Sequence, residues 1–183
     1  MAANSLLIPA LPLVDMTTVA TTLNNPFLAP ESAVNGVWFS ILNNYFPQPN
    51  YIIKPEVRVP NAGDADLVVQ SQAIAGGAVA WAWRVCYEGK APGADTWLNI
   101  RTQVSGYPRR ALANGAWCWC VAGMGRGVSF WRFRKNDMID VKPVDLYGGA
   151  VRIQNSAGMP PVYDIVNDQA AIDTMMRYIV LNP

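Results

Sequence analysis

The chain has 183 residues, of which 51% are hydrophobic and 15% charged, and its formal net charge is +1. A chain of this length and composition is not disordered and can bury a substantial core. Histidine is absent, which excludes Ser-His-Asp and Cys-His nucleophile systems and histidine-ligated zinc sites. Acid–base or metal chemistry must therefore use Asp, Glu, Lys, Tyr or Cys.

Compartment and membrane association follow from the apolar segments and the cysteines. No apolar run approaches the roughly 20 residues needed to span a bilayer. The N-terminal segment lacks a basic leader and is interrupted by Pro9 and Pro12, so we expect no signal peptide. Cys86, Cys118 and Cys120 are odd in number and lie in strand-like runs, which favours buried thiols over a Cys-x-Cys metal site. We expect an intracellular protein, cytoplasmic or nuclear, without a membrane partner.

The first half of the chain predicts an arm, a helix and three strands. Residues 1–30 are rich in Pro, Thr and Asn without a sustained period and predict an N-terminal arm over the core. Residues 31–46 carry apolar side chains at helical spacing, and Pro47 and Pro49 end the helix. Strand-like segments follow at 51–59, despite Pro55, at 65–70 and at 79–88, with a turn at Gly76-Gly77 before the last of them.

The second half predicts a helix, a hairpin and a final helix. Asp95 can cap a helix over 96–112, bent near Pro108, and strands at 117–122 and 128–135 flank a turn at 123–127. Short strands are expected within 137–154, and Asn167 or Asp168 can cap the last helix. The order of helices and strands predicts an α/β (α+β) fold with a mixed central sheet flanked by helices. Residues 31–183 would form one domain, with its core at about 31–135 and a C-terminal extension at 136–183.

The stretch with the strongest chemical signal combines Asp66 with Glu88-Gly89-Lys90. Side chains alternate faces along a strand, so Glu88 and Lys90 project together from the end of an apolar strand. Ionised groups beside a core are costly unless they pair or hold a metal, so this cluster is a candidate site. Two carboxylates on adjacent strands can bind Mg²⁺ or Mn²⁺ through oxygen, and Lys90 could orient a water molecule and offset phosphate charge.

An Asp followed by Glu-x-Lys on the next strand resembles the PD-(D/E)xK nuclease superfamily. Gln103 and Tyr107 match the Gln-x-x-x-Tyr signature of its RecB-like branch, one turn apart on the following helix. Pro55-Glu56 before the Asp strand and the Trp-rich strand after the helix are closest to fungal members. The resemblance covers about residues 31–135 and implies a restriction-endonuclease-like core of order αβββαββ.

The resemblance also implies roles for individual residues. Asp66 and Glu88 would bind the metal, with the Gly89 carbonyl as a further ligand, and Lys90 would be the catalytic lysine. Gln103 would steady the site or contact the phosphate. Three accessory residues accompany these: Glu56 as an upstream acid, Tyr107, and Asp64, which competes with Asp66 for the metal role.

The distribution of charge suggests a nucleic acid as partner, either DNA or structured RNA. Residues 96–136 contain no acidic side chain, but they contain seven cations: Arg101, Arg109, Arg110, Arg126, Arg132, Arg134 and Lys135. Aromatic residues are interleaved with them, which suits phosphate contact combined with base stacking. Most of these aromatic residues are expected in the core, with one or two in a binding role.

Three functions fit this pattern. The first is a metal-dependent nuclease that hydrolyses phosphodiester bonds of DNA or RNA. The second is a toxin-like protein that removes a base from RNA, as ribosome-inactivating proteins do, using Glu88 or Glu56 with an arginine and a stacking aromatic residue. The third is a catalytically silent nucleic-acid-binding protein on the same fold.

Overall fold

An eight-stranded sheet with helices on both faces forms the fold in a computed structural model, which describes residues 30–75 and 78–183. The expected arm, apart from Pro30, and the Gly76-Gly77 turn lie outside these residues. The helices and strands are α2 (Glu31–Tyr45), β1 (Tyr51–Val59), β2 (Gly63–Ala75), β3 (Ala78–Lys90), α3 (Trp97–Ala111), β4 (Trp117–Met124), β5 (Gly127–Arg134), β6 (Val141–Tyr147), β7 (Ala150–Ile153), β8 (Tyr163–Asp164) and α4 (Gln169–Leu181).

The sheet is mixed but mostly antiparallel. Its strands follow the order β1-β2-β3-β4-β5-β6-β7, and β8 pairs with β5. Among the described strands, β3 and β4 form the one parallel pair. Parallel neighbours need a long crossover connection, and α3 supplies it. The α+β class with a mixed sheet flanked by helices, predicted from the sequence, is confirmed.

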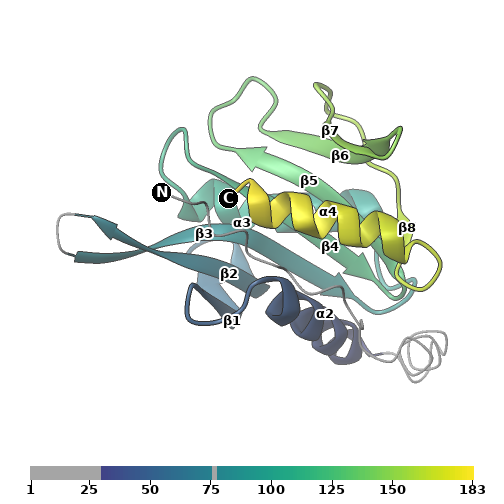
Figure 1. Cartoon of the computed structure of the whole chain (residues 1–183), viewed down its shortest axis with the longest axis horizontal. Coiled ribbons are helices and arrows are strands. Elements are labelled where there is room, and N and C mark those ends of the chain that lie inside the picture. Colours follow the sequence, from purple (N-terminus) through teal and green to yellow (C-terminus); the bar gives the residue numbers. More distant parts are fainter. Residues whose placement is uncertain (1–29, 76–77) are drawn as a thin grey trace, which may run out of the picture.

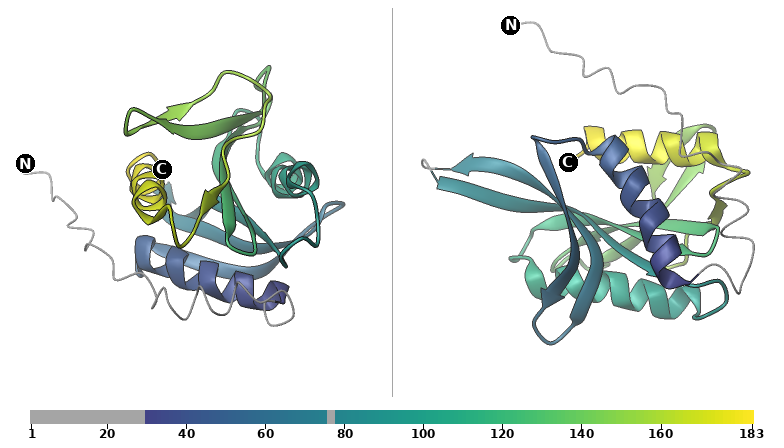
Figure 2. Two further views of the ribbon diagram at one scale, coloured as in Figure 1. Left: turned by 90° about the vertical axis from the view of Figure 1, so that its right-hand side faces the viewer. Right: turned by 90° about the horizontal axis from the view of Figure 1, so that it is seen from below.

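The helices divide the core into two layers. Helices α2 and α4 cover one face of the sheet and α3 covers the other, as Figures 1 and 2 show. Neighbouring residues of β3 point to opposite layers, so Tyr87 packs with α2 and Cys86 packs with α3. All three cysteines are free and buried in the α3 layer, which confirms the prediction of buried thiols.

Strands β2 and β3 are longer than the sequence pattern indicates. They extend to Gly63–Ala75 and Ala78–Lys90, where residues 65–70 and 79–88 were expected. Together the two strands form a hairpin that projects beyond the rest of the sheet in Figure 1.

Two helix starts differ in detail from the expectation. Thr96 is the N-cap of α3, and its hydroxyl accepts a hydrogen bond from Asn99 N at 3.2 Å. The Asp95 carboxylate instead accepts from Thr96 N at 2.7 Å, one residue earlier, so the predicted cap was displaced by one position. Asp168 is the N-cap of α4, but its side chain accepts from Asp164 N at 2.7 Å rather than from the helix.

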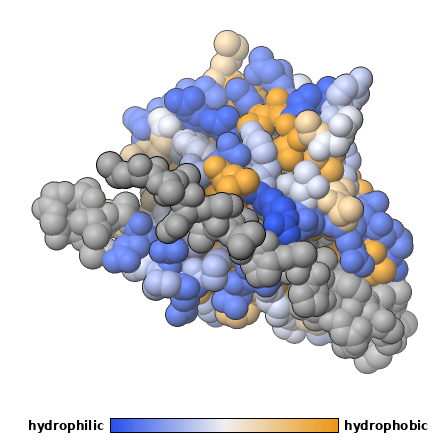
Figure 3. Space-filling view, in the orientation of Figure 1, coloured by the Kyte–Doolittle hydropathy of each residue, from blue (hydrophilic) through white to orange (hydrophobic). Residues whose placement is uncertain are grey.

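The surface of the described part is mixed in character. In the view of Figure 3, hydrophilic residues cover most of the coloured surface and smaller hydrophobic areas lie between them. Within residues 30–75 and 78–183, no helix is both long and apolar enough to cross a bilayer.

Candidate active site at the end of strand β3

The antiparallel pairing of β2 with β3 brings Asp66 to the Glu88-Gly89-Lys90 segment. Leu67 pairs with Tyr87, so the next position along each strand places Asp66 opposite Glu88. The Gly89 N–H donates to Asp66 Oδ2 at 2.7 Å. Where the β2–β3 pairing ends, the Asp66 carboxylate thus accepts the hydrogen bond that a backbone carbonyl of β2 would otherwise accept.

Glu88 is nearly inaccessible to solvent, with 3% of its surface exposed. Lys90 Nζ donates to Glu88 Oε1 at 2.5 Å, which shows that the two side chains share a face of β3. The other oxygen, Oε2, is buried and has no described partner in hydrogen-bond geometry, although the Tyr107 hydroxyl approaches the carboxyl group. One half of this carboxylate is therefore unsatisfied, which is costly for a buried charged group.

Burial raises the pKa of Glu88 to about 7, and the charge of Asp66 adds to the rise, although the hydrogen bond from Lys90 opposes it. Burial also raises the pKa of Asp66, against the Gly89 N–H and the Lys90 charge. Burial alone would lower the pKa of Lys90, but its bond to Glu88 and the nearby carboxylates outweigh this and raise it. Lys90 is therefore a stable cation in a cluster of carboxylates.

Helix α2 contributes two residues that the sequence analysis missed. Glu31 Oε1 lies 3.5 Å from Lys90 Nζ, and a hydrogen bond from Asn35 lowers the pKa of Asp66. Glu31 and Asn35 are four residues apart and lie on one face of the helix. Polar residues recur along α2, at Ser32, Ser40, Asn43 and Asn44, so no sequence signal distinguished Glu31 and Asn35.

Two glycines allow α2 to approach the sheet at this point. A Cβ at Gly89 would overlap Asn35 Oδ1 and lie 2.7 Å from the Tyr87 hydroxyl. Gly123, its neighbour on β4, would place a Cβ 2.9 Å from Trp38 Nε1. A side chain at either position would push α2 away, and Glu31 and Asn35 with it.

Helix α3 covers the cluster from the opposite face. Tyr107 is buried, and its hydroxyl is close enough to Glu88 to lower the pKa of that carboxyl. Gln103 lies one turn earlier on α3, and its Oε1 is buried without a hydrogen-bond partner among the described residues. Tyr107 therefore reaches the cluster, and Gln103 brings a further unsatisfied oxygen to the same helix face.

The two remaining accessory candidates lie in different places. Glu56 is exposed, has φ of 49°, and lies opposite Asp66 in the pairing of β1 with β2. It shares with Asp66 and Asn35 the wall of a cavity of about 260 Å³. Asp64 forms an exposed ion pair with Arg58 at 3.2 Å. The structure thus brings Glu56 towards the cluster and directs Asp64 to solvent.

The oxygen atoms of this region fit a hard cation. No group of three His, Cys, Asp or Glu side chains in the described part of the chain is arranged to share a metal ion. A site for Mg²⁺ can nevertheless use one or two carboxylates and complete its shell with water. On the α3 side, two buried oxygens without hydrogen bonds belong to the carboxylate and amide classes that suit such a cation: Glu88 Oε2 and Gln103 Oε1. Asn35 Oδ1 and the Tyr87 hydroxyl are also unsatisfied, but they lie on the α2 side.

The cations of the acid-free span lie on both faces of the sheet. Arg109 pairs with Asp140 at 2.7 Å and lies over Phe133 on the α3 side. Arg132 lies over Trp117 on the opposite side, at 5.0 Å from its ring centre. Three of the other five cations are bonded or buried: Arg126 bonds to Asp164, Lys135 donates to the Leu112 carbonyl, and Arg101 Nε is buried. The remaining two, Arg110 and Arg134, are exposed.

Comparisons of the chain with family models, with curated proteins and with solved structures find no match. The function must therefore be argued from the site itself, because a fold alone does not determine an activity.

Proposed function

We propose that this protein is a metal-dependent nuclease that hydrolyses phosphodiester bonds of DNA or RNA with Mg²⁺ or Mn²⁺. The observation that carries the proposal is a buried carboxylate, Glu88, with one oxygen held by Lys90 and the other unsatisfied. Glu31, Asp66 and Glu88 together with Lys90 carry a charge of −2 when all are ionised. A divalent cation would neutralise this charge and occupy the unsatisfied oxygen.

Each residue has a distinct task in this proposal. Asp66 and Glu88 would hold the metal, with the Gly89 carbonyl as a third protein oxygen, as the PD-(D/E)xK resemblance implies. The bound cation supplies Lewis acidity towards the scissile phosphate and lowers the pKa of water. Lys90, protonated by its carboxylate neighbours, offsets phosphate charge and orients the attacking water. Glu31 positions Lys90, and Tyr107 positions Glu88.

The element order supports assignment of the fold as restriction-endonuclease-like. From α2 to β5 the chain runs helix, three antiparallel strands, crossover helix, a strand parallel to the third, and a strand antiparallel to that one. The candidate residues lie near the start of β2, at the end of β3 and on α3, where that family places its Asp, Glu-x-Lys and Gln-x-x-x-Tyr residues. Glu31 on the first helix takes the accessory acid position better than Glu56 does.

The test is incubation with plasmid, single-stranded DNA and structured RNA in Mg²⁺, in Mn²⁺ and in excess chelator. We expect cleavage with either metal, none with chelator, and none in Glu88→Gln or Lys90→Met. Full activity in chelator with release of free base would support the base-removing alternative instead. Binding without turnover under every metal condition would support the silent nucleic-acid-binding alternative.

A further inference from the structure

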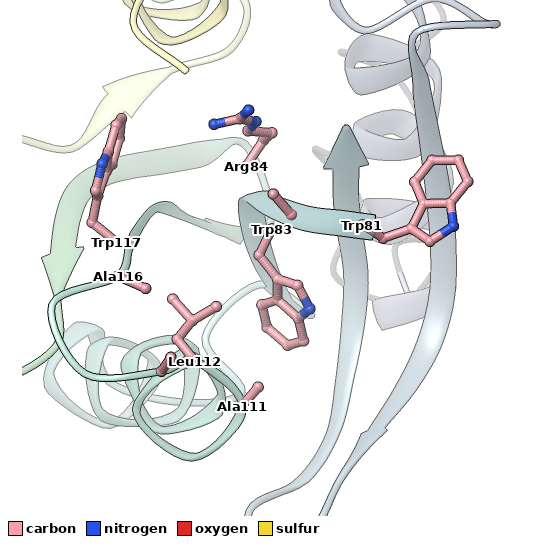
Figure 4. A pocket seen from close by; sticks show the side chains of 9 residues that line it. Trp81, Trp83, Arg84, Ala111, Leu112, Ala116 and Trp117 are labelled. Atoms are coloured by element: carbon pink, nitrogen blue, oxygen red, sulfur yellow. The ribbon is translucent and has the colours of Figure 1, made fainter. Parts of the chain in front are cut away.

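A second hollow lies at the other end of β3 from the candidate active site. It has a volume of about 480 Å³ and is lined by Trp81, Trp83, Arg84, Leu112 and Trp117, among others. In Figure 4, Trp83 and Trp117 stand on two sides of it, Leu112 lies between them, and Arg84 lies above. We call this the tryptophan pocket.

A β-bulge in β3 creates the pocket. Val69 pairs with Val85 and Gln70 pairs with Trp83, so Arg84 is an extra residue in β3. The extra residue reverses the alternation, and Trp83 therefore packs with the α3 layer although it is two residues from Val85. Bulges redirect side chains in this way and are frequent beside functional sites.

The chemistry of the pocket is aromatic and cationic. Arg132 Cζ lies 5.0 Å from the ring centre of Trp117, whereas the Trp81 ring points away from the hollow in Figure 4 and lies 6.0 Å from Lys54 Nζ. Arg84 itself is half-buried and held by a hydrogen bond to Ser71 Oγ at 2.6 Å. Among the described lining residues there is no carboxylate. Aromatic rings flanked by cations suit a single-stranded nucleic acid, because a base can stack on a ring while the cations contact the neighbouring phosphates. They suit a duplex less well, because its bases are not exposed for stacking.

We infer that the tryptophan pocket binds an unpaired base of the nucleic-acid substrate, an inference that rests on the nuclease function proposed above. A base can enter such a pocket only from a single-stranded segment, because paired bases are stacked inside a duplex. Trp83 and Glu88 are five residues apart on β3, or about 17 Å. The pocket therefore holds a base several nucleotides from the scissile phosphate and selects substrates with a single-stranded segment.

Binding in excess chelator tests this inference without cleavage. A fluorescent single-stranded oligonucleotide of about 20 nucleotides and a blunt duplex of the same sequence would be titrated with wild type and with Trp117→Leu. Trp117 is half-buried at the start of β4, and leucine there keeps an apolar side chain against the core. We expect wild type to prefer the single strand, and Trp117→Leu to weaken single-strand binding about tenfold, as loss of one stacked base does. Duplex binding should not change.

The chain offers a matched control and a second variant. Like Trp117, Tyr147 is an aromatic residue with an arginine over its ring, Arg152 at 4.7 Å, but it is exposed and lies on β6. Tyr147→Ala should bind both nucleic acids as wild type does. Arg84→Met should weaken single-strand binding and reduce its dependence on salt, since it removes one phosphate contact.

The outcomes separate the two proposals. Equal single-strand binding by wild type, Trp117→Leu and Arg84→Met would overturn the pocket, even if metal-dependent cleavage were found. An equal loss of single-strand and duplex binding in Trp117→Leu would also overturn it. If the pocket variants lose the preference for single strands but the wild-type protein cleaves under no metal condition, the base site is retained and the nuclease function is rejected.

Discussion

Two carboxylates of this protein are almost equally buried but have opposite electrostatic environments. Glu88 and Asp145 are 3% and 7% exposed. Asp145 accepts hydrogen bonds from Arg152 Nε at 3.1 Å, Arg152 NH2 at 2.7 Å and Gln154 Nε2 at 2.7 Å. The bonds from Arg152 hold the pKa of Asp145 below its usual range, although burial opposes this. Glu88 has one lysine, and burial raises its pKa to about 7.

The difference lies in how each charge is compensated. Both oxygens of Asp145 have partners on β7 or directly after it, so its site is complete within the fold. Glu88 shares Lys90 with Asp66 and Glu31, and one of its oxygens has no partner among the described residues. A complete ion pair contributes to folding, whereas an incomplete buried site indicates a missing ligand.

The largest expected effect is on cleavage. Glu88→Gln should reduce metal-dependent cleavage by at least about 1,000-fold, because a bound metal contributes several kcal/mol to such a transition state. The control is Asp145→Asn, which replaces the equally buried carboxylate outside the site and should retain wild-type cleavage. Initial rates on a single-stranded and a duplex substrate measure both. Wild-type cleavage by Glu88→Gln would show that the site has been misplaced.

The second prediction concerns pH and uses the protein in excess chelator. The usual pKa of a Glu is 4.5 and that of folded Glu88 is about 7, so the folded state holds more protons between these values. The free energy of unfolding should therefore fall as pH rises from about 4.5 to 7, by on the order of 3 kcal/mol, since each pKa unit corresponds to about 1.4 kcal/mol. Denaturant titrations at several pH values measure this.

Glu88→Gln should remove most of that pH dependence, leaving the smaller contribution of Asp66, whose pKa is also raised. At pH 8 in chelator its unfolding free energy should equal or exceed that of wild type. Asp145 behaves in the opposite way, because its pKa is lowered from the usual 3.8 and its stabilisation is lost only as pH falls below that value. A wild-type stability that does not change between pH 5 and 8 would contradict the raised pKa of Glu88.

The third prediction tests how α2 is held against the site. Gly89→Ala should lower the unfolding free energy by about 1–3 kcal/mol, because its Cβ would overlap Asn35 and crowd Tyr87. Gly106→Ala, in the interior of α3 with no neighbouring atom within 4 Å of the added Cβ, should instead raise it by about 0.5–1 kcal/mol. Chemical denaturation of the two variants measures this difference in sign. If Gly89→Ala proved as stable as wild type, α2 would not be tightly packed there.

The chemistry of the site could be predicted where it depends on one strand and its neighbour. Asp66, Glu88 and Lys90 come together because strand alternation and antiparallel pairing bring them there, and both rules can be read from the sequence. Glu31 and Asn35 could not be placed, because their position depends on how closely α2 packs on Gly89 and Gly123. The distance between a helix and a sheet depends on tertiary packing, and no periodic pattern in the sequence indicates it.

The same division applies to the fold. The helices and most strands were predicted within a few residues, since their burial follows regular periods. The bulge at Arg84 left no such signal, so the sequence pattern did not show that Trp83 turns to the α3 layer. The acid-free span was similarly read as one surface, but alternation along β5 places Arg132 and Phe133 on opposite faces.

The fourth prediction separates the two carboxylates without any assay of activity. A ligand stabilises a protein only as far as it binds the native state, so Mg²⁺ at ten times its dissociation constant should raise the unfolding free energy of wild type by about 1.4 kcal/mol. Asp145→Asn should start from a lower stability, by about 1–2 kcal/mol for its weakened hydrogen bonds, and gain the same increment from the metal. Glu88→Gln should start as high as wild type or higher and gain little, because it has lost a ligand. Thermal melts with and without Mg²⁺ give all three increments, and an undiminished increment in Glu88→Gln would mean that the cation binds elsewhere.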